Sequence, residues 1–156
     1  MRRFLPSLLA AFTLLGCGGA YREFPRWRFT APAPAEAGCA AARAWVRTSG
    51  KTGVGLSVEL RSRGDCVVTF KRAELVLTSG ERFPATAPAP VTLRGRSLIY
   101  VWVPFEFDNN RAWNDGHRDG SFEFELDASG ATTAWILPAA HRREHRYVPG
   151  SDPWRR

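Results

Sequence analysis

The sequence predicts an all-β antiparallel sandwich, and three observations support this fold class. After residue 44, apolar side chains alternate with polar ones in several short runs, a period typical of half-buried strands. Turn residues such as Ser79-Gly80 separate these runs. Beyond the N-terminal segment, no stretch keeps the 3.6-residue apolar repeat of a helix, except that we expect one or two helical turns in the Ala-rich residues 36–44.

About seven strands follow from this alternation. In residues 54–60, Val54, Leu56, Val58 and Leu60 share one face, and residues 122–126 repeat the pattern. Residues 98–107 (LIYVWVPFEF) are almost continuously apolar, which predicts a central strand covered on both faces. Short strands at this spacing predict an immunoglobulin-like antiparallel β-sandwich. The expected strands are 54–60, 66–70, 74–78, 98–107, 122–126 and 133–137, with a further element beginning at residue 91.

The N-terminus has the features of an export signal. Arg2 and Arg3 precede a twelve-residue apolar run, residues 4–15. A helix of that length spans about 18 Å, whereas the hydrocarbon core of a bilayer is roughly 30 Å thick. The run is therefore too short for a stable transmembrane anchor, and no later apolar run is longer.

The end of this segment, Leu14-Leu15-Gly16-Cys17, resembles the lipobox of bacterial lipoproteins. The resemblance implies a diacylglyceryl group on the Cys17 sulfur, cleavage just before Cys17, and attachment to a membrane through two or three acyl chains. Gly18, where an Asp would resemble an inner-membrane retention signal, implies the outer membrane. The alternative is ordinary cleavage after Ala20, which would remove Cys17 and leave a soluble protein.

Two further cysteines remain if Cys17 carries lipid. Cys39 and Cys66 form an even pair, and an oxidising compartment favours a disulfide between them. The alternative is two buried free thiols.

We therefore expect four parts: the signal peptide (1–16), a tether (17–38), the sandwich domain (39–138) and a basic flexible tail (139–156). The APAPA stretch in the tether favours an extended polyproline conformation. Several aromatic residues are unusual for a spacer, and we expect them to pack on the domain rather than lie at the membrane interface. They are Tyr21, Phe24, Trp27 and Phe29.

The charge is basic, at +7 for the whole sequence, and it falls to +5 when Arg2 and Arg3 are removed with the signal. An exported protein rarely meets nucleic acid, so an envelope protein, an acidic lipid, lipopolysaccharide or a cell-wall polymer is the expected partner. The alternative is a solvated basic surface without a specific partner.

The most distinctive polar stretch lies between two predicted strands, in residues 105–124. Asn and Asp are common in loops because they hydrogen-bond their own backbone, but such residues could also contact a ligand or partner, or hold Ca²⁺. No EF-hand spacing is present, and we predict no defined metal site. Loops at the end of a sandwich often bind, so this is the candidate binding loop. Its polar residues are Asp108, Asn109, Asn110, Asn114, Asp115 and Asp119.

The sequence contains short matches to catalytic motifs, but the residues around each match do not fit the corresponding chemistry. Gly50-Lys51-Thr52 lacks the earlier glycine of a phosphate-binding loop, and a predicted strand follows it. His141 and His145 fit the H-x-x-E-H pattern of zinc proteases, but only eleven residues remain to supply a third ligand. The third histidine, His117, has no evident orienting partner. We therefore expect neither catalytic residues nor a cofactor.

The tryptophans are expected in the core or at its rim rather than as binding platforms; they are Trp45, Trp102, Trp113 and Trp135. The architecture resembles the small immunoglobulin-like domains of bacterial surface lipoproteins. This resemblance implies a lipid-anchored envelope protein with a non-catalytic structural or protein-binding module. The alternative is a periplasmic ligand- or calcium-binding domain that uses the loop 108–119.

Overall fold

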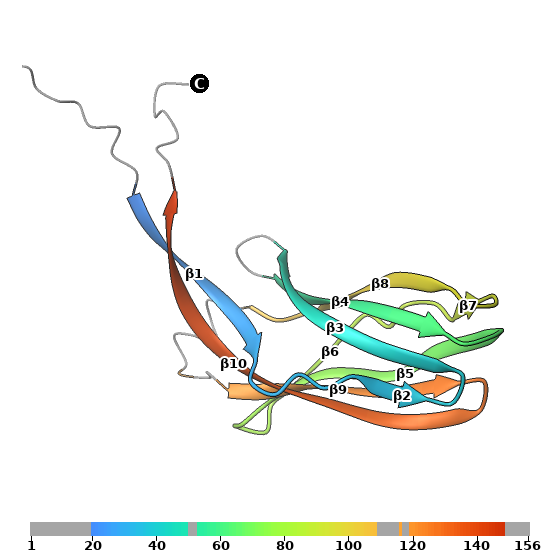
Figure 1. The fold of residues 1–156 in the computed structure, drawn as a ribbon. Helices are drawn as coiled ribbons and strands as arrows, with labels where there is room; N and C mark the ends of the chain where they lie inside the picture. Colours follow the sequence, from blue (N-terminus) through green and yellow to red (C-terminus); the bar gives the residue numbers. More distant parts are fainter. Residues whose placement is uncertain (1–19, 50–52, 109–115, 117–118, 149–156) are drawn as a thin grey trace, which may run out of the picture.

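The computed structural model describes residues 20–49, 53–108, 116 and 119–148. Two antiparallel sheets pack against each other as a β-sandwich (Figure 1), which confirms the predicted fold class. Within the described residues there is no helix that is long and apolar enough to cross a membrane.

The strands divide into sheet A and sheet B. Sheet A has the order β1 (Ala20–Phe29), β10 (Ala131–Val148), β9 (Asp119–Ala128), β5 (Cys66–Leu77) and β6 (Arg82–Pro84), and β7 (Val91–Leu93) also pairs with β5. Sheet B has the order β2 (Ala35–Ala37), β3 (Ala40–Ser49), β4 (Gly53–Ser62) and β8 (Leu98–Phe105). Apart from β1, the strands of eight or more residues have the order β3-β4-β8 in sheet B and β10-β9-β5 in sheet A, which matches the A-B-E and G-F-C orders of immunoglobulin domains.

The core lies between the two sheets. Phe122, Phe124 and Leu126 of β9 are almost fully buried, and so are Leu56 and Leu60 of β4. Each such side chain contributes roughly 1.5–3 kcal/mol through its burial. This alternation, inward on both sheets, is what the period of two in the sequence predicts.

The predicted disulfide is present. Cys39, which precedes β3 of sheet B, is bonded to Cys66 at the start of β5 in sheet A, with their Cα atoms 5.8 Å apart. The bond therefore joins the two sheets at one end of the sandwich.

The helical turns predicted for residues 36–44 are wrong. The segment forms β2 and the start of β3, with Ala35, Ala37, Ala40 and Ala42 buried. Pairing of β3 with β4 overrides the helical preference of alanine. Because partly buried alanines, Ala41 and Ala44, also occur in this stretch, the sequence shows no apolar alternation there.

The strands predicted at 66–70 and 74–78 are one strand, β5, interrupted by a bulge. The pairing with β9 shifts register between Phe70 and Arg72. The buried positions change from even to odd numbers across the bulge, because one extra residue moves the following side chains to the other face.

Strand β8 is an edge strand, and the prediction of a central strand covered on both faces is wrong. It pairs along its length with β4, and only at its end does Phe105 also form an isolated bridge, with Ala85. One face of β8 contributes Val103 and Phe105 to the core, while Tyr100 and Trp102 on the other face are exposed.

The predicted tether and tail both contain strand. Residues 20–29 of the tether form β1, and residues 139–148 of the tail belong to β10. Beyond Ala140, β10 leaves β9 and pairs with β1 alone, so His141–Val148 and Ala20–Trp27 form a two-stranded ribbon. Eight residues in a strand extend about 26 Å. The ribbon projects from the sandwich, and the described part of the chain begins and ends at its tip (Figure 1).

Candidate binding face

The outer face of sheet B carries exposed aromatic side chains on β3 and β8, the two strands that flank β4. Trp45 of β3 and Trp102 of β8 both stand opposite Ser57 of β4, so the three form one row across the sheet. Arg43, Glu59 and Tyr100 form the next row. Trp45 and Trp102 are 42% and 43% exposed and Tyr100 is 60% exposed. We call Trp45, Tyr100 and Trp102, together with Arg43 and Arg47, the aromatic face.

Trp102 lies over a glycine of the neighbouring strand. A Cβ atom placed on Gly55 would come within 2.3 Å of two carbons of the Trp102 ring. The ring therefore occupies the space that a side chain at position 55 would fill. Only glycine allows this close approach, and it leaves the ring resting on β4 with its other side open to solvent.

A buried carboxylate supports the adjoining row. Glu59 is 4% exposed, and it accepts hydrogen bonds from Arg61 Nε at 2.5 Å and from the Tyr100 hydroxyl at 3.0 Å. The hydrogen bond from Arg61, followed by that from Tyr100, lowers the pKa of Glu59 against the opposing effect of burial. Donation to this carboxylate raises the pKa of Tyr100. Glu59 thus holds Tyr100 in place and is itself neutralised by Arg61.

Trp45 lines three adjoining hollows on this side of the molecule. The first, of about 400 Å³, is lined by Trp45, Arg47, Ser57 and Tyr100. The second, of about 410 Å³, lies between β1 and β3 and includes Arg26, Arg28 and Arg47. The third, of about 290 Å³, includes Pro32, Pro34 and Arg43. Trp45 is therefore the residue that these three depressions share.

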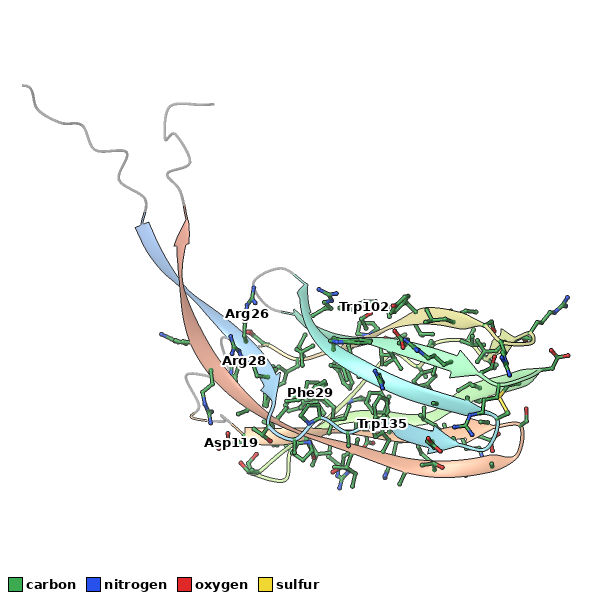
Figure 2. The ribbon with its side chains drawn as sticks, in the orientation of Figure 1. Arg26, Arg28, Phe29, Trp102, Asp119 and Trp135 are labelled. Atoms are coloured by element: carbon green, nitrogen blue, oxygen red, sulfur yellow. A yellow bond between two sulfur atoms is a disulfide. The ribbon has the colours of Figure 1, made fainter. Side chains whose placement is uncertain are left out.

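The charge lining the three hollows is of one sign. Their linings contain four arginines and no Asp or Glu, and Figure 2 shows two of these arginines on β1 and Trp102 on sheet B. Among the residues that the structure describes, Arg43 and Arg47 form no ion pair. The arginines are Arg26, Arg28, Arg43 and Arg47. Aromatic rings surrounded by guanidinium groups suit an anionic ligand that also has an apolar face.

The candidate loop 108–119 is described only at its ends and at Gly116. Asp108 is exposed, and Asp119 begins β9 and accepts a hydrogen bond from Arg142 Nη1 at 3.2 Å. Asn109, Asn110, Asn114, Asp115 and His117 lie outside the described residues. Among the residues that the structure describes, no three His, Cys, Asp or Glu side chains lie close enough together to hold a metal ion.

The H-x-x-E-H sequence lies on a strand and not on a helix. His141 of β10 is fully buried, and its ring stacks on that of Trp27 with centroids 5.0 Å apart. On a helix, residues 141 and 145 would be one turn apart, whereas in a strand their backbone positions are about 13 Å apart, so the helical spacing of the motif does not apply. The side chains of Glu144 and His145 are outside the described set.

The other aromatic predictions divide between core and surface. Trp135 lies in the core between the sheets (Figure 2), and its indole N–H donates to the Ala33 carbonyl at 2.8 Å. Trp27 and Phe29 pack on the domain, where both rings meet Phe122 edge to face. Trp113 and the side chains of Tyr21 and Phe24 lie outside the described residues.

Trp45 and Trp102 are on an open sheet face, which the sequence reasoning missed. The signal was the period of two in Trp45-x-Arg47 and Tyr100-x-Trp102, which puts each pair on one face of a strand. In residues 98–107 this period is hard to recognise, because the residues that alternate with Tyr100 and Trp102 are also apolar.

Cys17, the predicted lipid attachment residue, also lies outside the described part of the chain, three residues before β1.

The sequence and fold were compared with known proteins. No protein-family model matches the chain, and neither a curated protein nor a solved structure matches it significantly.

Proposed function

We propose that this chain is a lipid-anchored lipoprotein of the bacterial cell envelope, held at the outer membrane, and that its sandwich is a non-catalytic binding module. The observation that carries the proposal is the aromatic face. Monomeric proteins rarely expose two tryptophans and a tyrosine together unless a partner covers them. The tryptophans stand on β3 and β8, which flank β4 in a hydrogen-bonded sheet, so the face is formed before any partner arrives.

The anchoring half of the proposal rests on the lipobox-like sequence that ends at Cys17. Two observations from the fold support it. The Cys39–Cys66 disulfide is typical of proteins outside the reducing cytosol. The β1–β10 ribbon starts three residues after Cys17, so it would keep the sandwich about 26 Å from a membrane that holds the lipid.

A binding assay on envelope material tests the proposal. The full chain, purified in detergent, is mixed with sonicated envelope fragments from which lipid has been extracted, and bound protein is measured after sedimentation. We expect wild-type protein to sediment with the fragments, and the Trp45→Ala/Trp102→Ala double variant to remain in the supernatant because the aromatic face is lost.

Ile136→Ala is the matched control, because Ile136 is 56% exposed but lies on β10 of sheet A. It should sediment like the wild type. If the double variant and wild-type protein sediment equally, the aromatic face is not the binding surface and the proposed binding module is wrong.

A further inference from the structure

We infer that the aromatic face binds an acidic polysaccharide, a polymer whose sugar rings carry carboxylates at regular intervals. The inference deepens the proposed function and rests on it, because it names the class of partner that the same face recognises.

The arrangement of charge along β3 is the first argument. Arg43, Trp45 and Arg47 alternate with inward residues, so all three point outward from one strand. The two arginines are four residues apart, or about 13 Å along the strand, with the tryptophan between them. A polymer with repeated negative charges can pair with both guanidinium groups at once while it crosses the tryptophan between them.

The exposed rings are the second argument. Trp45 and Tyr100 have centroids 6.4 Å apart and planes tilted by 50°, so they do not stack face to face on each other. Trp102 rests on Gly55 and presents its other side outward. The C–H face of a sugar ring is apolar while its rim is polar, and it can lie on an aromatic ring as the polar rim meets arginine and Ser57.

Charge also argues against the other occupants. A second copy of this chain would bring Arg43 and Arg47 of both copies together across the shared face, which like-charge repulsion opposes. A single-stranded nucleic acid would satisfy both the rings and the arginines. The Cys39–Cys66 disulfide argues against it, since that bond is typical of compartments where nucleic acid is rarely met.

Titration calorimetry on the full chain in detergent tests the inference. The probe is an oligogalacturonate of fixed length, compared with its fully methyl-esterified form and with an oligothymidylate of equal charge. We expect the acid oligosaccharide to bind and the neutral ester to bind on the order of tenfold more weakly or not at all. Raising the salt concentration should weaken the binding.

A set of variants distinguishes binding by the aromatic face from non-specific attraction to the positive charge of the protein. Trp45→Ala and the Arg43→Gln/Arg47→Gln pair should each weaken binding on the order of tenfold, and the arginine pair should also reduce its salt dependence. Lys71→Gln/Arg72→Gln removes the same charge from β5 of sheet A and should leave binding unchanged. Trp102→Ala should weaken binding as Trp45→Ala does. If Trp102→Ala fails to fold, Gly55→Ala replaces it, because this variant displaces the Trp102 ring while keeping every aromatic residue.

Four results would overturn the inference: no binding of the acid oligosaccharide, equal binding of its ester, tighter binding of oligothymidylate, or equal losses in the sheet A control. A dimer that Trp102→Ala dissociates would also overturn it, because the face would then be a contact between copies. If the oligosaccharide does not bind while envelope fragments still bind in a Trp45-dependent way, the inference fails and the proposed function stands.

Discussion

The contact between Gly55 and Trp102 gives the candidate binding face its form. Sequence reasoning treats a glycine in a strand as a weak point, since it has no side chain to pack. Here the missing side chain makes the space in which the indole ring lies. A residue that adds nothing to the core thus determines where an exposed ring on the neighbouring strand is held.

Gly55→Ala should move the Trp102 ring without unfolding the domain. The new Cβ would lie 2.3 Å from ring carbons, so the ring must turn away, while the strand itself tolerates alanine. Among the indole N–H signals in a ¹H–¹⁵N NMR spectrum, that of Trp102 should shift most. Gly64→Ala is the control, because a Cβ there meets nothing within 4 Å. An unchanged Trp102 signal in Gly55→Ala would contradict the contact.

The Glu59 carboxylate predicts a pH dependence of stability. The pKa of Glu59 is lowered in the folded protein, chiefly by the hydrogen bond from Arg61, relative to its usual value of 4.5. The folded state therefore favours the charged form, and the stabilisation is complete above pH 4.5 and is lost as the pH falls through the lower folded value. The pKa of Asp127 is also lowered, chiefly by the Gly130 amide, and acts in the same direction.

Urea unfolding between pH 7 and pH 3 measures this effect. The free energy of unfolding of the wild type should fall as the pH drops below about 4.5. In Glu59→Gln the free energy of unfolding should decrease less steeply over this pH range. Adding Asp127→Asn should remove part of the decrease that is left. The same slope in Glu59→Gln and in wild-type protein would show that the carboxylate is not held by Arg61 and Tyr100 as described.

At the scale of elements, the predicted strands are right where large apolar side chains lie on one face only. The predictions are wrong where both faces of a strand are apolar, and where neither face carries large apolar side chains. Strands β4 and β9 were predicted because large apolar residues alternate with polar ones. β8 has apolar residues on both faces, and the sequence cannot distinguish a strand buried on both sides from an edge strand that offers one side to a partner. β3 buries only alanines along its first half, so its alternation could not be seen.

The pairing of β1 with β10 could not be predicted for a different reason. Their partners are more than a hundred residues apart in the sequence, as in Trp27 opposite His141. No local pattern records such a pairing. Residues 20–27 of the predicted tether and 141–148 of the predicted tail are therefore strands of one ribbon, and His141 in the predicted flexible tail is a buried ring.

The disulfide is the covalent link between the two sheets, and its removal should be costly. The cysteines are 27 residues apart, so loss of the loop closure should lower the free energy of unfolding by roughly 3 kcal/mol. Denaturant unfolding of Cys39→Ser/Cys66→Ser measures this cost. Adding a reductant should lower the stability of wild-type protein by a similar amount and leave the variant unchanged. Equal stability of variant and wild type would contradict a stabilising role for the bond.

At the scale of the whole molecule, the ribbon next to the proposed anchor and the proposed binding face lie in different parts of the structure. The ribbon tip is where the described chain begins, close in sequence to Cys17, and the aromatic face belongs to sheet B of the sandwich (Figure 1). If Cys17 carries lipid as proposed, this hydrogen-bonded ribbon would separate that face from the membrane by about 26 Å.

Cys17→Ala should release the protein from the membrane. Without the thiol no diacylglyceryl group can be attached, so incorporation of labelled palmitate should be lost and the chain should leave the membrane fraction. Cys39→Ser/Cys66→Ser should keep both the label and the membrane location. A wild-type protein that begins at Tyr21 and carries no acyl mass would disprove the anchor.

Hydroxyl-radical footprinting of the full chain on envelope fragments tests the central claim most directly, because it reads each exposed side chain in the bound state. The account predicts that oxidation of Trp45, Tyr100 and Trp102 falls on binding, while Ile136 on sheet A is oxidised as before. Protection confined to the loop 108–119, with the three aromatic side chains of sheet B still fully reactive, would contradict it.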